Sequence, residues 1–356
     1  MLTGKSVPSK KPAKERWVGT MFSFLATFLY GISNVVIRYL TECDVDTDWI
    51  LFYKETIGLS LLTPWLLIRW YQGRFRYSSK RLVLYIIVAA IFCQLIGARL
   101  QVLGYAVIGL IIAVPLIQSS VLLGVAILGY HIFGDPLSRR RKTAIAILIA
   151  AVVILSIGKE LTTSGQSHAK DTVSTGVFLL VAAGAIITGI SYAVHIIILR
   201  YVIRQFWKDE NSAWLSFQFY HWMGHDHAEK PGQRFYSPFP VTLMMSIVLG
   251  VGIVIFGTFL YCKHGIAGFS NVPHVPWYLP WYCILISGVA NMTGFFFQIQ
   301  GLRMTSAVQA SLIAISQMLI LSLIGYLFFH EAVNMLVMVG LGLTVYGVFM
   351  SAKPEK

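Results

Sequence analysis

Long hydrophobic runs separated by short polar stretches dominate the pattern along this chain. A helix needs about 20 apolar residues to cross the hydrocarbon core of a bilayer, and ten runs reach or approach that length. These runs cover residues 17–39, 49–70, 82–106, 109–133, 142–158, 175–203, 240–261, 281–302, 305–328 and 333–351. The pattern therefore predicts an all-α integral membrane protein with ten transmembrane helices.

Two long segments of this pattern resemble each other. The segment that begins at Gln101 reads QVLGYAVIGLIIAVPLIQSSVLLGVAILGYHIFGDPLS, and the one that begins at Gln298 reads QIQGLRMTSAVQASLIAISQMLILSLIGYLFFHEAVN. Both end on a glycine-tyrosine pair followed by an acidic residue, which is Asp135 in the first and Glu331 in the second. Internal similarity of this kind is typical of transporters built from repeats. Because each half holds five spans, the second half is expected to lie inverted relative to the first.

A second similarity supports the same division. The sequence Gly31-Ile32-Ser33 in the first run recurs as Gly189-Ile190-Ser191 in the sixth. The predicted organisation is a basic tail, a first repeat, an outer linker, a second repeat with a cytoplasmic insertion, and a short cytoplasmic tail. Their boundaries are 1–16, 17–158, 159–174, 175–351 (insertion 204–239) and 352–356.

Composition and charge narrow the class of protein. Of the 356 residues, 56% are hydrophobic and only 12% are charged, about half the charged share of a soluble domain. The net charge of +13 comes from lysines and arginines in short clusters between the hydrophobic runs, with no basic face or recognition motif for nucleic acid. Such clusters favour cytoplasmic loops. We therefore expect an inner- or plasma-membrane protein with both termini in the cytoplasm, which does not bind nucleic acid.

The insertion 204–239 is rich in aromatic residues. An amphipathic helix on the membrane surface explains them, and a docking element for a partner protein is the alternative. Within it, His221, His225, Asp226 and His227 are residue types that bind zinc, but their spacing matches no standard site. The expectation is a solvated loop, with no metal and no cofactor.

The ten spans, the two five-helix halves and the GYHIFGD and GYLFFHE endings resemble the drug/metabolite transporter superfamily, specifically its EamA-type repeats. The resemblance covers the chain from Trp17 to Ser351 apart from the insertion. The family's glycine-glutamate pair at these endings appears as Gly134-Asp135 and His330-Glu331. The resemblance implies secondary transport of a small solute and does not specify which one.

Charged residues within the predicted spans are candidates for substrate binding, since ionisable groups are costly in a membrane. They are Arg38, Lys54, Glu55 and Arg99, all in the first repeat. Structural pairing among them is the alternative. Lys54 and Glu55 are adjacent and point about 100° apart on a helix, so at least one is expected to reach another helix. Arg99 is the favoured substrate contact, and the excess of cations favours a carboxylate or phosphate.

Uncharged polar residues form a second set of candidates. Asn34 in the first span corresponds to Tyr192 in the sixth, and His195 lies on the same helix face as Tyr192. Asn291, Gln298 and Gln317 follow in the eighth and ninth spans. Hydrogen bonds between helices are the alternative role for these side chains. His195 is either a proton carrier or a structural histidine bonded to a carbonyl.

These observations favour a secondary transporter, an exporter or exchanger of a small solute such as an amino acid or an anionic metabolite, working by alternating access. A receptor or scaffold that acts through the aromatic insertion is the alternative. An enzyme is not expected, because no cluster of catalytic groups accompanies the spans. The expected partners are the solute and the lipid bilayer, with a homodimer as an open alternative.

Overall fold

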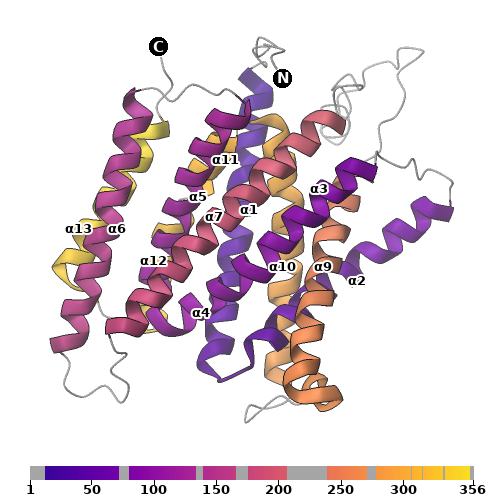
Figure 1. The fold of residues 1–356 in the computed structure, drawn as a ribbon, viewed down its shortest axis with the longest axis horizontal. Coiled ribbons are helices and arrows are strands. Elements are labelled where there is room, and N and C mark those ends of the chain that lie inside the picture. The colour runs from indigo at the N-terminus through magenta and orange to yellow at the C-terminus, as the bar shows by residue number, and fades with distance from the viewer. Residues whose placement is uncertain are drawn as a thin grey trace.

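The computed structural model describes residues 13–71, 80–133, 139–165, 175–206, 239–270, 278–305, 307–314, 316–331 and 333–352, and the regular structure in these ranges is helical. The elements, labelled in Figure 1, are α1 (Ala13–Glu42), α2 (Thr47–Tyr71), α3 (Lys80–Ile91), η1 (Phe92–Ala98), α4 (Arg99–Ile108), α5 (Leu110–Phe133), α6 (Arg139–Gly165), α7 (Thr175–Phe206), α9 (Phe239–His264), η2 (Gly265–Phe269), α10 (Tyr278–Met304), α11 (Ala307–Ala314), α12 (Ser316–Phe328) and α13 (Met335–Ala352). Each of the ten predicted runs falls on one of these helices or on consecutive ones.

Six helical stretches of the described chain are long and apolar enough to cross a membrane. They are Trp17–Glu42, Arg81–Ile108, Leu110–Ile132, Gly176–Ile203, Val241–Phe269 and Tyr278–Met304. Shorter apolar helices cover Lys142–Ala151, Ser316–Phe328 and Met335–Gly347. The 25-residue α2 is not among the six, and it holds the charged pair Lys54 and Glu55. The chain is thus a multi-pass membrane protein. The number of ten spans remains a prediction.

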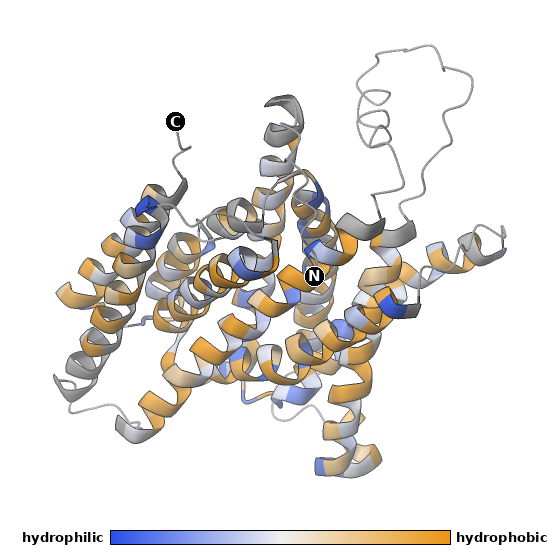
Figure 2. Ribbon diagram, turned by 45° about the horizontal axis from the view of Figure 1, so that its top comes forward, coloured by the Kyte–Doolittle hydropathy of each residue, from blue (hydrophilic) through white to orange (hydrophobic). Residues whose placement is uncertain are grey.

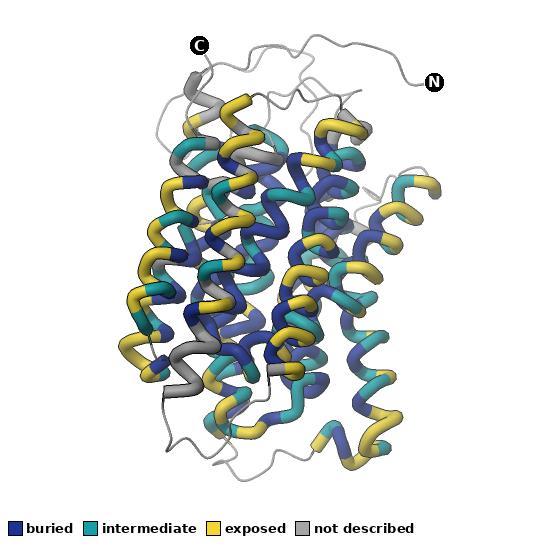
Figure 3. The backbone as a smooth tube through the Cα atoms, turned by 60° about the vertical axis from the view of Figure 1, so that its left-hand side comes forward, coloured by how far each residue is buried: buried dark blue, intermediate teal, exposed yellow. Residues whose placement is uncertain are grey.

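The outward faces of the helices are hydrophobic. In Figure 2 hydrophobic residues run along the length of the helices, and in Figure 3 exposed residues follow the outer side of the bundle while buried ones face inward. Leu180, Val254 and Phe328 are exposed over 70%, 69% and 73% of their surfaces. So many exposed apolar side chains are unfavourable in water and are satisfied by lipid.

The main helix contacts in one half of the chain have counterparts in the other half. On one flank α6 packs along α13, and on the opposite flank α2 packs along α9 (Figure 1). The contact of α1 with α10 has its counterpart in the contact of α7 with α3, η1 and α4. Likewise, the contact of α5 with α7 corresponds to that of α11 and α12 with α1. In their most extensive contacts, the helices of one half thus pack against partners equivalent to those of their counterparts.

Close helix contacts depend on small residues. Gly189 on α7 lies against α5, and a Cβ added there would come within 2.4 Å of the carbonyl oxygen of Ile117. Gly176 on the same helix faces open space, with nothing within 4 Å of such a Cβ. The first glycine therefore sets the distance between α5 and α7, as small residues do in membrane helix pairs.

The structure tests the predicted linker 159–174 in part and leaves most of the predicted insertion 204–239 undescribed. The helix α6 continues to Gly165, so the first part of the segment 159–174 that was predicted as a linker is helical. In contrast, residues 207–238 lie outside the described residues, and with them the predicted amphipathic helix and the histidines at 221, 225 and 227.

Candidate functional site

A cavity of about 170 Å³ lies between the two halves of the chain. Its wall comes from α1, α2, η1, α4 and α5 in the first half and from α7, α9, α10, α11 and α12 in the second. Eight of the ten residues predicted to contact substrate line it, namely Asn34, Lys54, Glu55, Tyr192, His195, Asn291, Gln298 and Gln317. The structure brings these residues together, and their role in binding stays a prediction.

Lys54 and Glu55 on α2 form an ion pair, with Nζ and Oε1 3.1 Å apart. Both residues are buried, at 7% and 2% exposure. The two long side chains curl toward each other, and Glu55 also packs against Gly252 of α9, so one of them contacts another helix as expected. Glu55 Oε2 is buried and accepts no hydrogen bond within the described residues. The pair is therefore neutral as a whole and leaves one carboxylate oxygen without a donor.

The helix that carries α3 and α4 widens between them into the π-helical turn η1, a feature common at functional sites. Ser191 on α7 donates a hydrogen bond to the carbonyl oxygen of Phe92 at the start of this turn. Gly97 lies against the ring of Tyr192, where an added Cβ would sit 2.7 Å from Cε1. The turn thereby leaves space for Tyr192 and brings Gln94 to the cavity wall.

Each half contributes a tyrosine bonded to a glutamine. The Tyr30 hydroxyl on α1 donates to Gln298 Oε1 on α10 at 2.7 Å. The Tyr192 hydroxyl on α7 donates to Gln101 Oε1 on α4. Gln101 and Gln298 are the equivalent first residues of the two similar segments, whereas Tyr30 lies one helical turn before Asn34, the residue that corresponds to Tyr192.

Further amide bonds join the helices around the cavity. Gln118 Nε2 on α5 donates to Gln317 Oε1 on α12 at 3.2 Å, which links the two halves directly. Gln101 Nε2 donates to Asn34 Oδ1 at 3.3 Å. Amide side chains both donate and accept, so this wall offers both kinds of hydrogen-bonding group to a solute.

His195 is buried, at 5% exposure, and its Nδ1 lies 3.3 Å from the carbonyl oxygen of Ala89 on α3. Its ring is also near that of Phe295, with centroids 5.9 Å apart. This contact with a carbonyl matches the structural alternative for His195, although the residue also lines the cavity.

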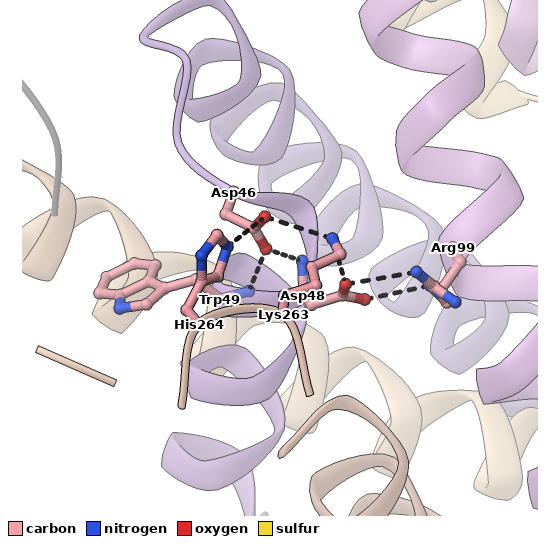
Figure 4. Close-up of polar contacts among 6 residues, drawn as sticks. All are labelled: Asp46, Asp48, Trp49, Arg99, Lys263 and His264. Atoms are coloured by element: carbon pink, nitrogen blue, oxygen red, sulfur yellow. Dashed lines mark hydrogen bonds and ion pairs between the residues drawn. The ribbon is translucent and has the colours of Figure 1, made fainter. Parts of the chain in front are cut away.

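Arg99, the favoured substrate contact, does not line the cavity. Figure 4 shows it directed at Asp48 at the start of α2, with Nε 3.0 Å from Oδ1. The guanidinium also stacks on Phe259 of α9, 3.9 Å from the ring centre. Lys263 Nζ lies 2.6 Å from the other oxygen of Asp48, a residue with no exposed surface. Arg99 therefore braces α2, α4 and α9 and is not part of the cavity wall.

Asp46 completes this cluster and caps α2. Its Oδ1 accepts the backbone N–H groups of Asp48 and Trp49 at 2.8 and 3.2 Å (Figure 4), as a residue at the N-terminus of a helix commonly does. Its Oδ2 lies 3.3 Å from Lys263 Nζ and 3.6 Å from His264 Nε2. Partial burial alone would raise the pKa of Asp46, but Lys263 and the two N–H groups outweigh burial and lower it.

Arg38 is likewise outside the cavity. Its guanidinium lies 2.9 Å from Glu42 and 3.6 Å from Glu331 Oε1. The Glu331 carboxylate accepts the N–H groups of Leu110 and Ile111 at 2.7 and 2.8 Å. The acidic residue at the end of the second similar segment thus caps helix α5 of the first half, where the positive end of the helix dipole favours it.

Several cavity residues were not predicted, among them Tyr30, Gln94, Gln118 and Ser311. A signal existed on α1, because its polar residues 23, 27, 30 and 34 recur at helical spacing and share one face. Gln118 begins a short polar stretch with Ser119 and Ser120, and Ser311 follows Gln309, but neither set recurs at helical spacing as the polar residues of α1 do. Within the described residues, no three His, Cys, Asp or Glu side chains lie close enough together to hold a metal ion.

Comparison with known proteins gives three findings. A solved structure titled only "Crystal structure of protein" is similar over 93% of this chain and 95% of its own, with a TM-score of 0.58 and 13% identity. At that identity the likeness shows the fold alone. No curated protein matched the chain. The sequence model of the family described as "EamA-like transporter family" matches residues 17–157 and 230–352, which together make up most of the sequence. This chain therefore belongs to the EamA-like transporter family, whose members are not enzymes.

Proposed function

We propose that this protein is a secondary transporter that carries a small organic solute through the cavity by alternating access. The main support is a cavity lined by polar side chains of both halves inside a bundle with hydrophobic outer faces. Polar and charged groups buried at membrane depth are costly and commonly mark the path of a solute.

We infer ten spans, arranged as two inverted five-helix repeats. The equivalent helix contacts support the two-fold relation, because exchanging the halves turns each of the extensive contacts described above into another that is present. In this arrangement α2, α6, α13 and the consecutive helices α11 and α12 also cross the membrane. The short loops between the spans carry most of the basic residues on one side, which supports an inner or plasma membrane and cytoplasmic termini.

With this orientation, the Asp48 and Glu331 contacts lie at the outer end of the bundle. Ser23 on α1 and Leu302 on α10, which line the cavity, belong to the inner half. We therefore assign the structure to a state closed toward the outside. Transport then requires these outer contacts to separate while the inner half closes.

The test is solute exchange in proteoliposomes loaded with a panel of small metabolites. Ala310→Trp fills the cavity wall on α11 and should lower exchange about tenfold or more. Leu323→Trp adds the same bulk at a position that is 58% exposed on the outside of α12 and should change exchange less than about twofold. Equal effects of the two variants would contradict a path through the cavity. Absence of exchange for every metabolite would favour the scaffold alternative.

A further inference from the structure

The charge balance of the cavity limits which solutes it can hold. We propose that the solute carries no net charge and presents an N–H group to Glu55 Oε2 and a hydrogen-bond acceptor to Gln317 Nε2. This inference rests on the proposed function, because it names the class of solute carried at the same site. The class comprises small zwitterions and neutral polar solutes such as amides.

Among the described residues that line the cavity, Lys54 is the lysine or arginine and Glu55 is the carboxylate, and in their ion pair the two charges cancel. The two arginines that would favour an anion are held elsewhere, Arg99 by Asp48 and Arg38 by Glu42 and Glu331. An ion brought into this cavity would lose its hydration without gaining an opposite charge, which is strongly unfavourable. The structure thus argues against an anionic metabolite and leaves the other solute named from the sequence, an amino acid, which is a zwitterion.

Two buried polar atoms of the cavity wall lack partners within the described residues. Glu55 Oε2 is an acceptor without a donor, and Gln317 Nε2 is a donor without an acceptor. Both residues are 2% exposed. Buried polar groups are nearly always hydrogen-bonded, and leaving one unpaired is costly. A solute with a donor at one end and an acceptor at the other satisfies both atoms.

The neighbouring groups support recognition by hydrogen bonds. Glu55 and Gln94 both pack against Gly252 of α9, where an added Cβ would lie 3.0 Å from Glu55 Cγ and 3.1 Å from Gln94 Nε2. The Ser311 hydroxyl is a further buried group in the wall that has no hydrogen-bond partner in the part of the chain that the structure describes. The volume of about 170 Å³ is below the range of drug-sized pockets, so the solute is small.

The test compares three groups of small solutes of similar size: zwitterions and neutral amides, monoanions such as carboxylates, and monocations such as amines. The full-length protein in nanodiscs is assayed for thermal stabilisation, and the protein in liposomes is assayed for exchange. Stabilisation and exchange by the first group alone support the proposal. The proposal is overturned if either ionic group gives the stronger stabilisation or exchange, or if none of the three groups stabilises the protein. Exchange of an ionic solute would overturn the charge inference and leave the proposed transport standing.

Charge-changing variants sharpen this test. Glu55→Gln makes the cavity net positive, should weaken binding of net-neutral solutes about 10- to 100-fold, and should shift the preference toward anions. Lys54→Gln should shift it toward cations, and the double variant should restore the preference for neutral solutes. Glu42→Gln, the same change outside the cavity, should leave binding unchanged. If Glu55→Gln left solute affinity unaltered and removed only the response of transport to a pH gradient, Glu55 would be a proton carrier. That result would overturn the proposed hydrogen bond between the solute and Glu55.

Discussion

Removing the Glu331 carboxylate should be among the most destabilising single changes at the outer end of the bundle. Glu331→Ala deletes two charge-assisted hydrogen bonds to the N-terminus of α5 and leaves the Leu110 and Ile111 N–H groups unpaired. It also removes the buried partner of Arg38 at 3.6 Å. Hydrogen bonds to charged groups contribute about 1.5–3 kcal/mol each, and breaking a buried ion pair costs about 3–5 kcal/mol. The two hydrogen bonds alone give an expected loss of about 3–6 kcal/mol, and the ion pair of the same carboxylate overlaps with them and is not added.

The assay is reversible unfolding of the purified protein in mixed micelles, followed by loss of helical circular dichroism. Glu42→Ala is the matched control, because Glu42 is the other carboxylate beside Arg38 but its side chain is 39% exposed. Exposed ion pairs contribute about 0–1 kcal/mol, so this variant should unfold close to the wild type. Equal stability of the two variants would refute the role of Glu331 as a cap on α5.

Three further changes follow from the described contacts. Asp48→Asn leaves two cations facing a neutral side chain in a fully buried position, so the free energy of unfolding should fall by about 3 kcal/mol in the same assay. Because the pKa of Asp46 is lowered from 3.8, the stability it adds is present above that pH and lost as the pH falls through its folded pKa; Asp46→Asn should flatten this acid-side loss in an unfolding titration. Gly189→Ala should cost about 1–3 kcal/mol by pushing α5 from α7, whereas Gly176→Ala should be neutral or slightly stabilising.

Much of the fold follows from the order of residues alone. Hydrophobic length located the helices, because a bilayer imposes one length on every span. The spacing of Gln101 and Gln298 indicated a duplication, and these residues occupy equivalent places in the two tyrosine–glutamine pairs. Asn34 and Tyr192 were related by the same reasoning, and both line the cavity.

The partners of the charged residues could not be predicted in this way. Arg99 lies within a hydrophobic run, but its carboxylate partner Asp48 is 51 residues away at the end of another helix. Whether such an arginine faces a cavity or a carboxylate depends on how α2 and α4 are rotated, which hydrophobic periodicity does not specify. The pairing of Lys54 with Glu55 depends on side-chain conformation, and the π-helical turn at η1 depends on contacts with α7.

Accessibility of the cavity from the two sides of the membrane tests the account most directly. Ser311→Cys, in a chain whose four cysteines have been replaced, places one thiol in the cavity wall on α11. Alternating access predicts labelling by an impermeant thiol reagent from the cytoplasmic side at rest, labelling from the outside under solute exchange, and protection by a carried solute. A thiol that no reagent reaches from either side, or one that both sides reach at rest without protection, would contradict transport through this cavity.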